Sequence, residues 1–231
     1  MDLDNNSSSD FELQPLDKSI FVEQHKTISS STYKNILLST AIIVIYSAAA
    51  VASSTTLVLI PNLETITIFV FLVSFYYGFR IGFLMMLTTS IIYELFASIV
   101  FGFGGPLFFF KILAYSINVI VASNLSKTLK DFSKEGQDLQ STITFASRFG
   151  FMLVGVILTL VFDLITTFYE LFLVQNMKAF VLLFIAGLPY ILFHELTNGI
   201  IFFFIPDYIK LLKLSNNSFT IGFDNKNVKQ N

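Results

Sequence analysis

The chain has 231 residues, of which 54% are hydrophobic and only 13% charged, whereas a soluble domain carries about 25% charged residues. The formal net charge of −2 offers no basic surface for nucleic acid, and the absence of cysteine excludes disulfides and thiolate-bound metals. These features predict an integral membrane protein. The acidic, polar start MDLDNNSSSD lacks the regions of a secretory signal, so we expect the first membrane helix to direct insertion.

In chain order, the apolar runs predict an all-α bundle of six membrane-spanning helices. A polar cytoplasmic tail covers 1–34, the membrane domain covers 35–206, and a second polar cytoplasmic tail covers 207–231. The expected spans lie at 35–63, 63–79, 81–101, 107–125, 149–172 and 179–205, with a polar loop at 126–147. The runs are too long for barrel strands, and unpaired backbone cannot face lipid.

The boundary between the second and third spans follows from length. A single helix over 63–101 would measure about 58 Å at 1.5 Å per residue, against about 30 Å of hydrocarbon. The chain must therefore turn, and Arg80 between Gly78 and Gly82 marks the place. The next loop, Gly102-Phe103-Gly104-Gly105-Pro106, combines flexible glycines with a proline that can start a helix.

The distribution of basic residues predicts the orientation. With six spans, all 14 lysines and arginines except Lys111 and Lys178 fall on the side that holds both termini. Basic residues favour the cytoplasmic side. We therefore expect a multi-pass protein of the plasma membrane with both termini in the cytoplasm.

Several ionisable or amide side chains fall in the outer half of the predicted spans. Such groups are costly in a bilayer and usually face protein or a water-filled cavity. We therefore predict an outward-facing substrate cavity formed by Glu94, Lys111, Asp163, His194 and Asn198. The alternative is internal pairing, Lys111 with Glu94 or Asp163, which would only hold helices together.

The segment His194-Glu195-Leu196-Thr197-Asn198 resembles half of a zincin motif, but the second histidine is replaced by Asn198. We therefore expect no metal site and no cofactor. No phosphate-binding loop of the G-x-x-x-x-G-K type is present, so ATP hydrolysis by that route is not expected in this chain.

The segment SAAAVASSTT, residues 47–56, makes one face of the first span unusually small. Small residues let membrane helices approach closely. Ala48 and Ala52 form an A-x-x-x-A pair, and Ala50 with Ser54 repeats the spacing. Such a helix could pack against a sister helix or offer a smooth face to another protein.

This arrangement resembles the substrate-binding (S) component of energy-coupling factor (ECF) transporters. Ala48 and Ala52 match the docking motif of the family's first helix. The segments Pro61–Glu64, Tyr77–Gly82 and Gly102–Pro106 are similar to features of the family, and the last two look like its vitamin-binding members, including the cobalamin-type branch. The resemblance covers about residues 36–206.

The resemblance implies a non-enzymatic subunit that captures a vitamin or related micronutrient for import. Its implied partners are a transmembrane coupling subunit, which would dock on Ala48 and Ala52, and two ATPase subunits that supply the energy. Two alternatives stay open: a six-helix membrane scaffold of the rod-shape morphogenesis type without transport activity, and an intramembrane enzyme. The enzyme would need a catalytic set, for which only Asp163 and Glu195 are candidates by depth.

Overall fold

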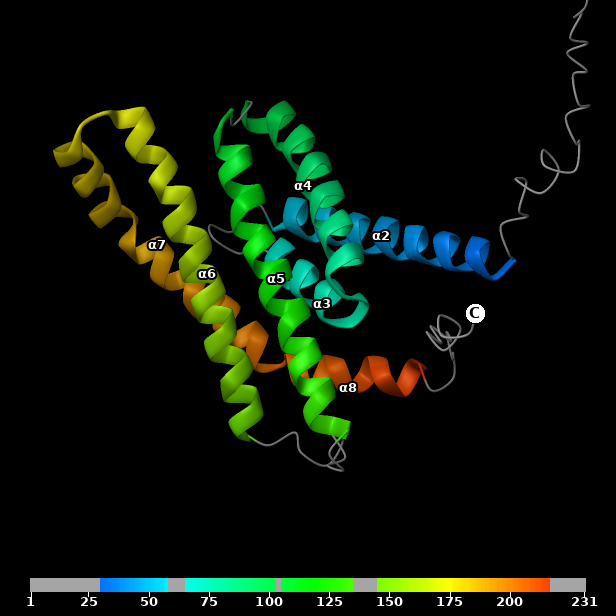
Figure 1. Cartoon of the computed structure of the whole chain (residues 1–231). Helices are drawn as coiled ribbons and strands as arrows, with labels where there is room; N and C mark the ends of the chain where they lie inside the picture. Colours follow the sequence, from blue (N-terminus) through cyan, green and yellow to red (C-terminus); the bar gives the residue numbers. More distant parts are fainter. Residues whose placement is uncertain (1–29, 58–64, 103–104, 135–144, 217–231) are drawn as a thin grey trace, which may run out of the picture. The chain divides into compact units, whose positions relative to one another are not determined.

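The computed structural model describes residues 30–57, 65–102, 105–134 and 145–216, and these residues form helices and turns without a strand among them. Backbone contacts divide the chain into Met1–Leu38 and Ser39–Asn231. The described part of the first unit is the beginning of α2, and the arrangement below concerns the second unit. Figure 1 shows the helices, which are α2 Ser30–Thr56, α3 Ile66–Tyr77, α4 Phe79–Phe101, α5 Leu107–Lys134, α6 Phe145–Val174, α7 Met177–Phe203 and α8 Ile205–Asn216.

Five stretches in the described residues are long and apolar enough to cross a bilayer: Tyr33–Thr56, Phe79–Val100, Leu107–Leu129, Phe145–Val174 and Met177–Lys210. They confirm the prediction of an all-α, multi-pass membrane protein. The expected second span is shorter than predicted, because α3 has 12 residues and so rises about 18 Å at 1.5 Å per residue. Its expected start at 63–64 lies outside the described residues.

The short helix α3 is the centre of the bundle. It contacts α4, α5 and α7, and in Figure 1 it lies behind α5. Seven of its 12 residues are buried, among them Phe71 and Phe75. The Phe71 ring meets Phe202 of α7 at 4.8 Å and Phe151 of α6 at 6.2 Å between centroids. An apolar helix of this length is suited to such a position, where neighbouring helices surround it in place of lipid.

The predicted turns agree with the structure. Gly78 separates α3 from α4 with φ of +82°, a conformation that glycine adopts without steric cost. The break expected between the spans at 149–172 and 179–205 is also present, and Asn176 caps α7 by accepting hydrogen bonds from the backbone amides of Lys178 and Ala179.

Three predicted boundaries differ from the structure. Helix α2 begins at Ser30, inside the predicted tail, and α5 continues to Lys134, into the predicted loop 126–147. The predicted polar tail after Pro206 begins instead with the helix α8. Proline is compatible with the first turn of a helix, where an N–H has no intrahelical partner, so Pro206 starts a new helix after α7 ends at Phe203.

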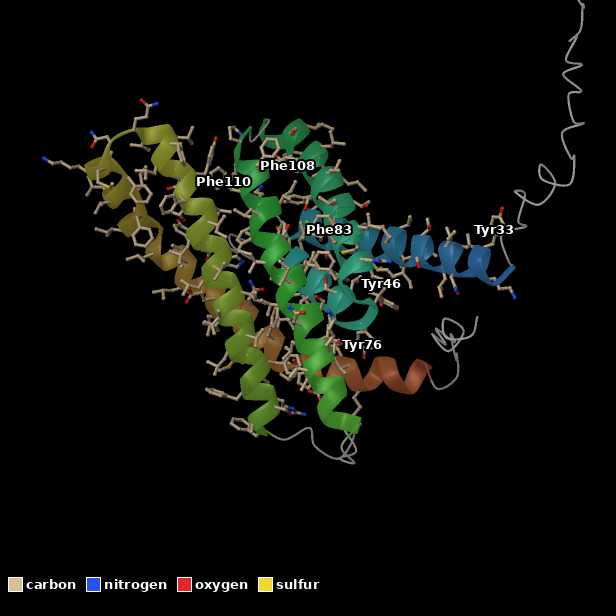
Figure 2. All side chains as sticks on the ribbon, viewed as in Figure 1. Tyr33, Tyr46, Tyr76, Phe83, Phe108 and Phe110 are labelled. Atoms are coloured by element: carbon tan, nitrogen blue, oxygen red, sulfur yellow. The ribbon has the colours of Figure 1, made fainter. Side chains whose placement is uncertain are left out.

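Helix α8 packs against the bundle through polar and apolar contacts. Tyr76 of α3 donates a hydrogen bond from its hydroxyl to the Ile209 backbone carbonyl, with an O–O distance of 2.5 Å; its place near α8 can be followed in Figure 2. Arg148 of α6 pairs with Asp207 at 2.9 Å. Ile205 and Ile209 are buried against the core. The segment that the sequence analysis assigned to a polar tail therefore forms a helix, because its apolar face covers the end of the bundle.

Candidate functional site

The polar residues predicted for a binding site occupy four different helices. Glu94 lies on α4, Lys111 on α5, Asp163 on α6 and His194 on α7, with Asn198 one turn after His194. The structure joins the first four into two pairs, one between α4 and α5 and one between α6 and α7.

The first pair links the Lys111 ammonium to the Glu94 carboxylate, with 3.6 Å between Nζ and Oε2. Glu94 is the more buried partner, since its side chain is 9% exposed against 25% for Lys111. The ammonium also lies 5.8 Å from the centre of the Tyr93 ring, close enough for a cation–π contact. The pairing of Lys111 with Glu94 is one of the two that the sequence left open.

The second pair joins Asp163 to His194. The His194 Nδ1 lies 2.9 Å and 3.1 Å from the two oxygens of Asp163. An ionised carboxylate can only accept, so Nδ1 donates, and this bond fixes the ring orientation. The alternative pairing of Asp163 with Lys111 is therefore not the one in the structure. The carboxyl of Asp163 contacts an imidazole here, an arrangement that the sequence did not predict.

Aromatic rings connect the two pairs. Tyr115 lies one turn after Lys111 on α5, and its ring meets the Phe162 ring at 5.0 Å between centroids. Phe162 in turn contacts the His194 ring edge-on at 6.1 Å. The Asp163–His194 pair is thus about one helical turn, or about 5.4 Å, deeper than Lys111. From the sequence these polar groups were expected at a similar depth in the outer half of the spans. In the structure the two pairs lie at two depths along the helix axes, one above the other.

The register of α6 against α7 is set by close contacts of two glycines. A Cβ on Gly155 would lie 2.6 Å from Cβ of Phe202 and overlap its ring, and a Cβ on Gly199 would lie 3.0 Å from a methyl of Val156. Such small residues allow helices to approach closely in a membrane. The contact of Gly155 with Phe202 and the contact of Asp163 with His194 belong to the same antiparallel register and lie two turns apart. The glycine contact therefore also positions the Asp163–His194 pair.

We expect Gly155→Ala to lower the thermal stability of the purified protein, because the added methyl overlaps the Phe202 ring. Overpacking of this kind costs about 1–3 kcal/mol, and each kcal/mol shifts the melting temperature of a chain of this size by about 2–4 °C. Gly150→Ala on the same helix is the matched control, since a Cβ there meets no atom within 4 Å. Equal melting temperatures for the two variants would contradict the register.

Asn198 lies one helical turn from the Asp163–His194 pair, on the side of the apolar core, and is 1% exposed. By the same register it lies opposite Thr159 of α6, which is also 1% exposed. The predicted placement of His194 and Asn198 on one face of α7 is confirmed, because both are buried. Within the described ranges, no three His, Asp or Glu side chains gather closely enough to hold a metal ion.

Two polar residues of this region were missed from the sequence. Asn118 is 3% exposed on α5, and its amide donates to the Thr67 backbone carbonyl of α3 at 2.8 Å. Thr159 is the second. A signal was present, because Asn118 follows Lys111 by two helical turns and Thr159 precedes Asp163 by one.

The predicted docking residues Ala48 and Ala52 are both exposed on α2, whereas Ala50 is 0% exposed. The inward face makes hydrogen bonds at Ser47, to the Met85 carbonyl at 3.3 Å, and at Ser54, to the Thr65 hydroxyl at 2.7 Å. The small-residue segment therefore has two faces, of which one packs inside the unit and one carries the A-x-x-x-A pair outward.

Comparison of the chain with family models, curated proteins and solved structures found no match.

Proposed function

We propose that the chain is the substrate-capture subunit of an ATP-driven importer of the ECF type, taking up a vitamin or related micronutrient, the cobalamin type among them. The observation that carries the proposal is the gathering of Glu94, Lys111, Asp163 and His194 from four helices into two stacked pairs. Polar groups at membrane depth are expensive and mark ligand or ion sites more often than surface charges do.

The exposed face of α2 supports the proposed partners. Ala48 and Ala52 present two methyl groups one turn apart, next to exposed Ile45. A flat surface of this kind suits close packing against another membrane helix. In the proposal, the transmembrane coupling subunit occupies this face, two ATPase subunits bind to that partner, and this chain performs no catalysis.

The basic residues support the proposed orientation. Arg80 begins α4, Lys127 lies near the end of α5, Arg148 lies near the start of α6 and Lys210 lies in α8. Because consecutive helices of the bundle alternate in direction, these ends gather beside α8 (Figure 1). We assign this end to the cytoplasmic side of the plasma membrane by the preference of Lys and Arg for that side. In the proposal the short α3, surrounded by other helices, counts as the second of six crossings, and both termini are in the cytoplasm.

Calorimetric titration of the purified chain tests the capture role. We expect a water-soluble vitamin to release or absorb heat on binding, and Asp163→Asn to weaken that binding about 10- to 100-fold, because a hydrogen bond to a charged group is worth about 1.5–3 kcal/mol. Asp207→Asn is the matched control, since Asp207 pairs with Arg148 at the α8 end. Its affinity should equal that of the unmodified chain.

A second candidate function is the six-helix scaffold without transport activity. It is favoured by the internal pairing of Lys111 with Glu94 and of Asp163 with His194, since polar groups that satisfy each other can hold helices together without a ligand. If no water-soluble vitamin or related base gives heat with the unmodified chain, the scaffold is the better explanation. Transporter ATPase genes beside the gene for this chain would favour the importer.

A further inference from the structure

A layer of buried amide and hydroxyl groups lies directly below the Asp163–His194 pair. Its members are Thr67 on α3, Asn118 on α5, Thr159 on α6 and Asn198 on α7. All four are at most 3% exposed. They lie one helical turn from Phe71, Ala122, Gly155 and Phe202, which form or adjoin the apolar core.

Three contacts between helices place these residues on one level. Asn118 bonds to the Thr67 carbonyl at 2.8 Å, which joins α5 to α3. Tyr115 meets Phe162, and three residues further along each antiparallel helix this register pairs Asn118 with Thr159. Asp163 meets His194, and one turn further the same register pairs Thr159 with Asn198. The layer therefore runs across all four helices.

The layer contains one amide oxygen and one amide nitrogen without a hydrogen-bond partner among the described residues. The Asn118 Oδ1 and the Asn198 Nδ2 are buried and have no hydrogen-bond partner among the residues that the structure describes. The Asn118 amide is oriented by its donation to a carbonyl, so its oxygen is necessarily the remaining acceptor. Buried amide atoms are almost always satisfied in folded proteins, and those that are not call for a missing partner.

We propose that this layer is the floor of the substrate site and recognises a ligand edge that carries one hydrogen-bond donor beside one acceptor, as in a carboxamide, a lactam or a cyclic urea. The ligand's donor bonds to Asn118 Oδ1 and its acceptor takes the hydrogen of Asn198 Nδ2. The inference rests on the proposed capture function and names the chemical class of its substrate.

The closed floor implies that the ligand enters by displacing a helix. Pro189 lies inside α7, five residues before His194, and a proline there removes the hydrogen bond to the preceding turn. The weakened point allows the half of α7 before Pro189 to tilt away from the part that carries His194 and Asn198, which stays packed against α6. The upper half of α7 is largely exposed, so few contacts oppose the movement.

The test is a calorimetric titration of the full chain with two groups of probes. Nicotinamide, riboflavin and biotin carry the required edge, whereas nicotinate and benzoate lack it, because a carboxylate at neutral pH offers only acceptors. We expect at least one probe of the first group to bind about tenfold or more tightly than both of the second.

We expect Asn198→Leu to weaken that binding by a similar factor while the melting temperature without ligand stays the same or rises, because an unsatisfied buried amide is replaced by an apolar group of similar size. Asn124→Leu, at an exposed asparagine of α5, is the matched control and should bind as the unmodified chain does.

The outcomes separate the inference from the proposed function. Absence of binding by every probe would overturn the inference, and titration with the remaining water-soluble vitamins, cobalamin among them, would then decide whether the capture function stands. Binding with unchanged affinity in Asn198→Leu would overturn the inference and leave capture intact, and the floor would then hold only ordered water. Equal or preferential binding of nicotinate or benzoate would overturn the inference without any variant, so a variant that fails to fold does not remove the test.

Discussion

Replacing Ala48 and Ala52 together by tryptophan is expected to abolish uptake while folding and substrate binding of the purified chain stay unchanged. Both positions are exposed on α2, so the large rings meet lipid in the isolated chain and cost little. In an assembled importer the same rings would hold the coupling subunit away from a surface that depends on close packing. The measurement is uptake of a radiolabelled vitamin by cells that produce the variant, beside calorimetry of the purified variant.

The matched control for this experiment is Ala50→Trp on the same helix. Ala50 is 0% exposed and lies between the two outward alanines, so a tryptophan there has no room and should lower the melting temperature and binding together. If the double variant instead loses folding and binding along with uptake, its face packs inside the protein. If uptake is unaffected, no partner docks on this face.

Gly82→Ala is expected to destabilise the protein more than Gly155→Ala does. A Cβ at Gly82 would lie 2.7 Å from the Cα of Ser74 and would overlap its hydroxyl oxygen. A backbone atom cannot rotate away, so α3 and α4 must separate just above the turn at Gly78. We expect a cost of about 3 kcal/mol, at the upper end for overpacking, and a melting temperature lower by roughly 6–12 °C.

Gly187→Ala provides the comparison. Gly187 is also inside a long apolar helix, but a Cβ there meets no atom within 4 Å. Alanine favours a helix over glycine by about 1 kcal/mol, so this variant should melt at the same or a slightly higher temperature. If the Gly82→Ala and Gly187→Ala proteins have the same melting temperature, α3 and α4 do not approach each other as closely as the structure places them.

The helices of this chain could be predicted because their signals are local. The length of each apolar run, its composition and the helix boundaries at Gly78 and Asn176 are read directly from neighbouring residues. The helices of the structure agree with these boundaries. Helix α8 was missed because the last span was ended at Pro206, although Ile205, Ile209 and Leu212 recur at helical spacing. Its contacts with Tyr76 and Arg148 show which face is covered. Tertiary packing decides such marginal helices.

The candidate site could be predicted only in part for the same reason. Burial costs identify Glu94, Lys111, Asp163 and His194 as residues that need partners, but partner choice depends on helix register. Register is fixed between helices, by contacts such as Gly155 with Phe202, and a single sequence does not encode it locally. Asn118 and Thr159 were overlooked because an uncharged polar residue in an apolar run is common, and their significance appears only when four helices bring them to one level.

The most direct test of capture is native mass spectrometry of the chain purified gently from its own membranes. We expect a population heavier than the 26.0 kDa polypeptide by the mass of one small molecule, which denaturation releases and which is reduced in Asp163→Asn. A spectrum containing only the bare polypeptide, unchanged after addition of each water-soluble vitamin, would contradict the proposal that this bundle binds a substrate.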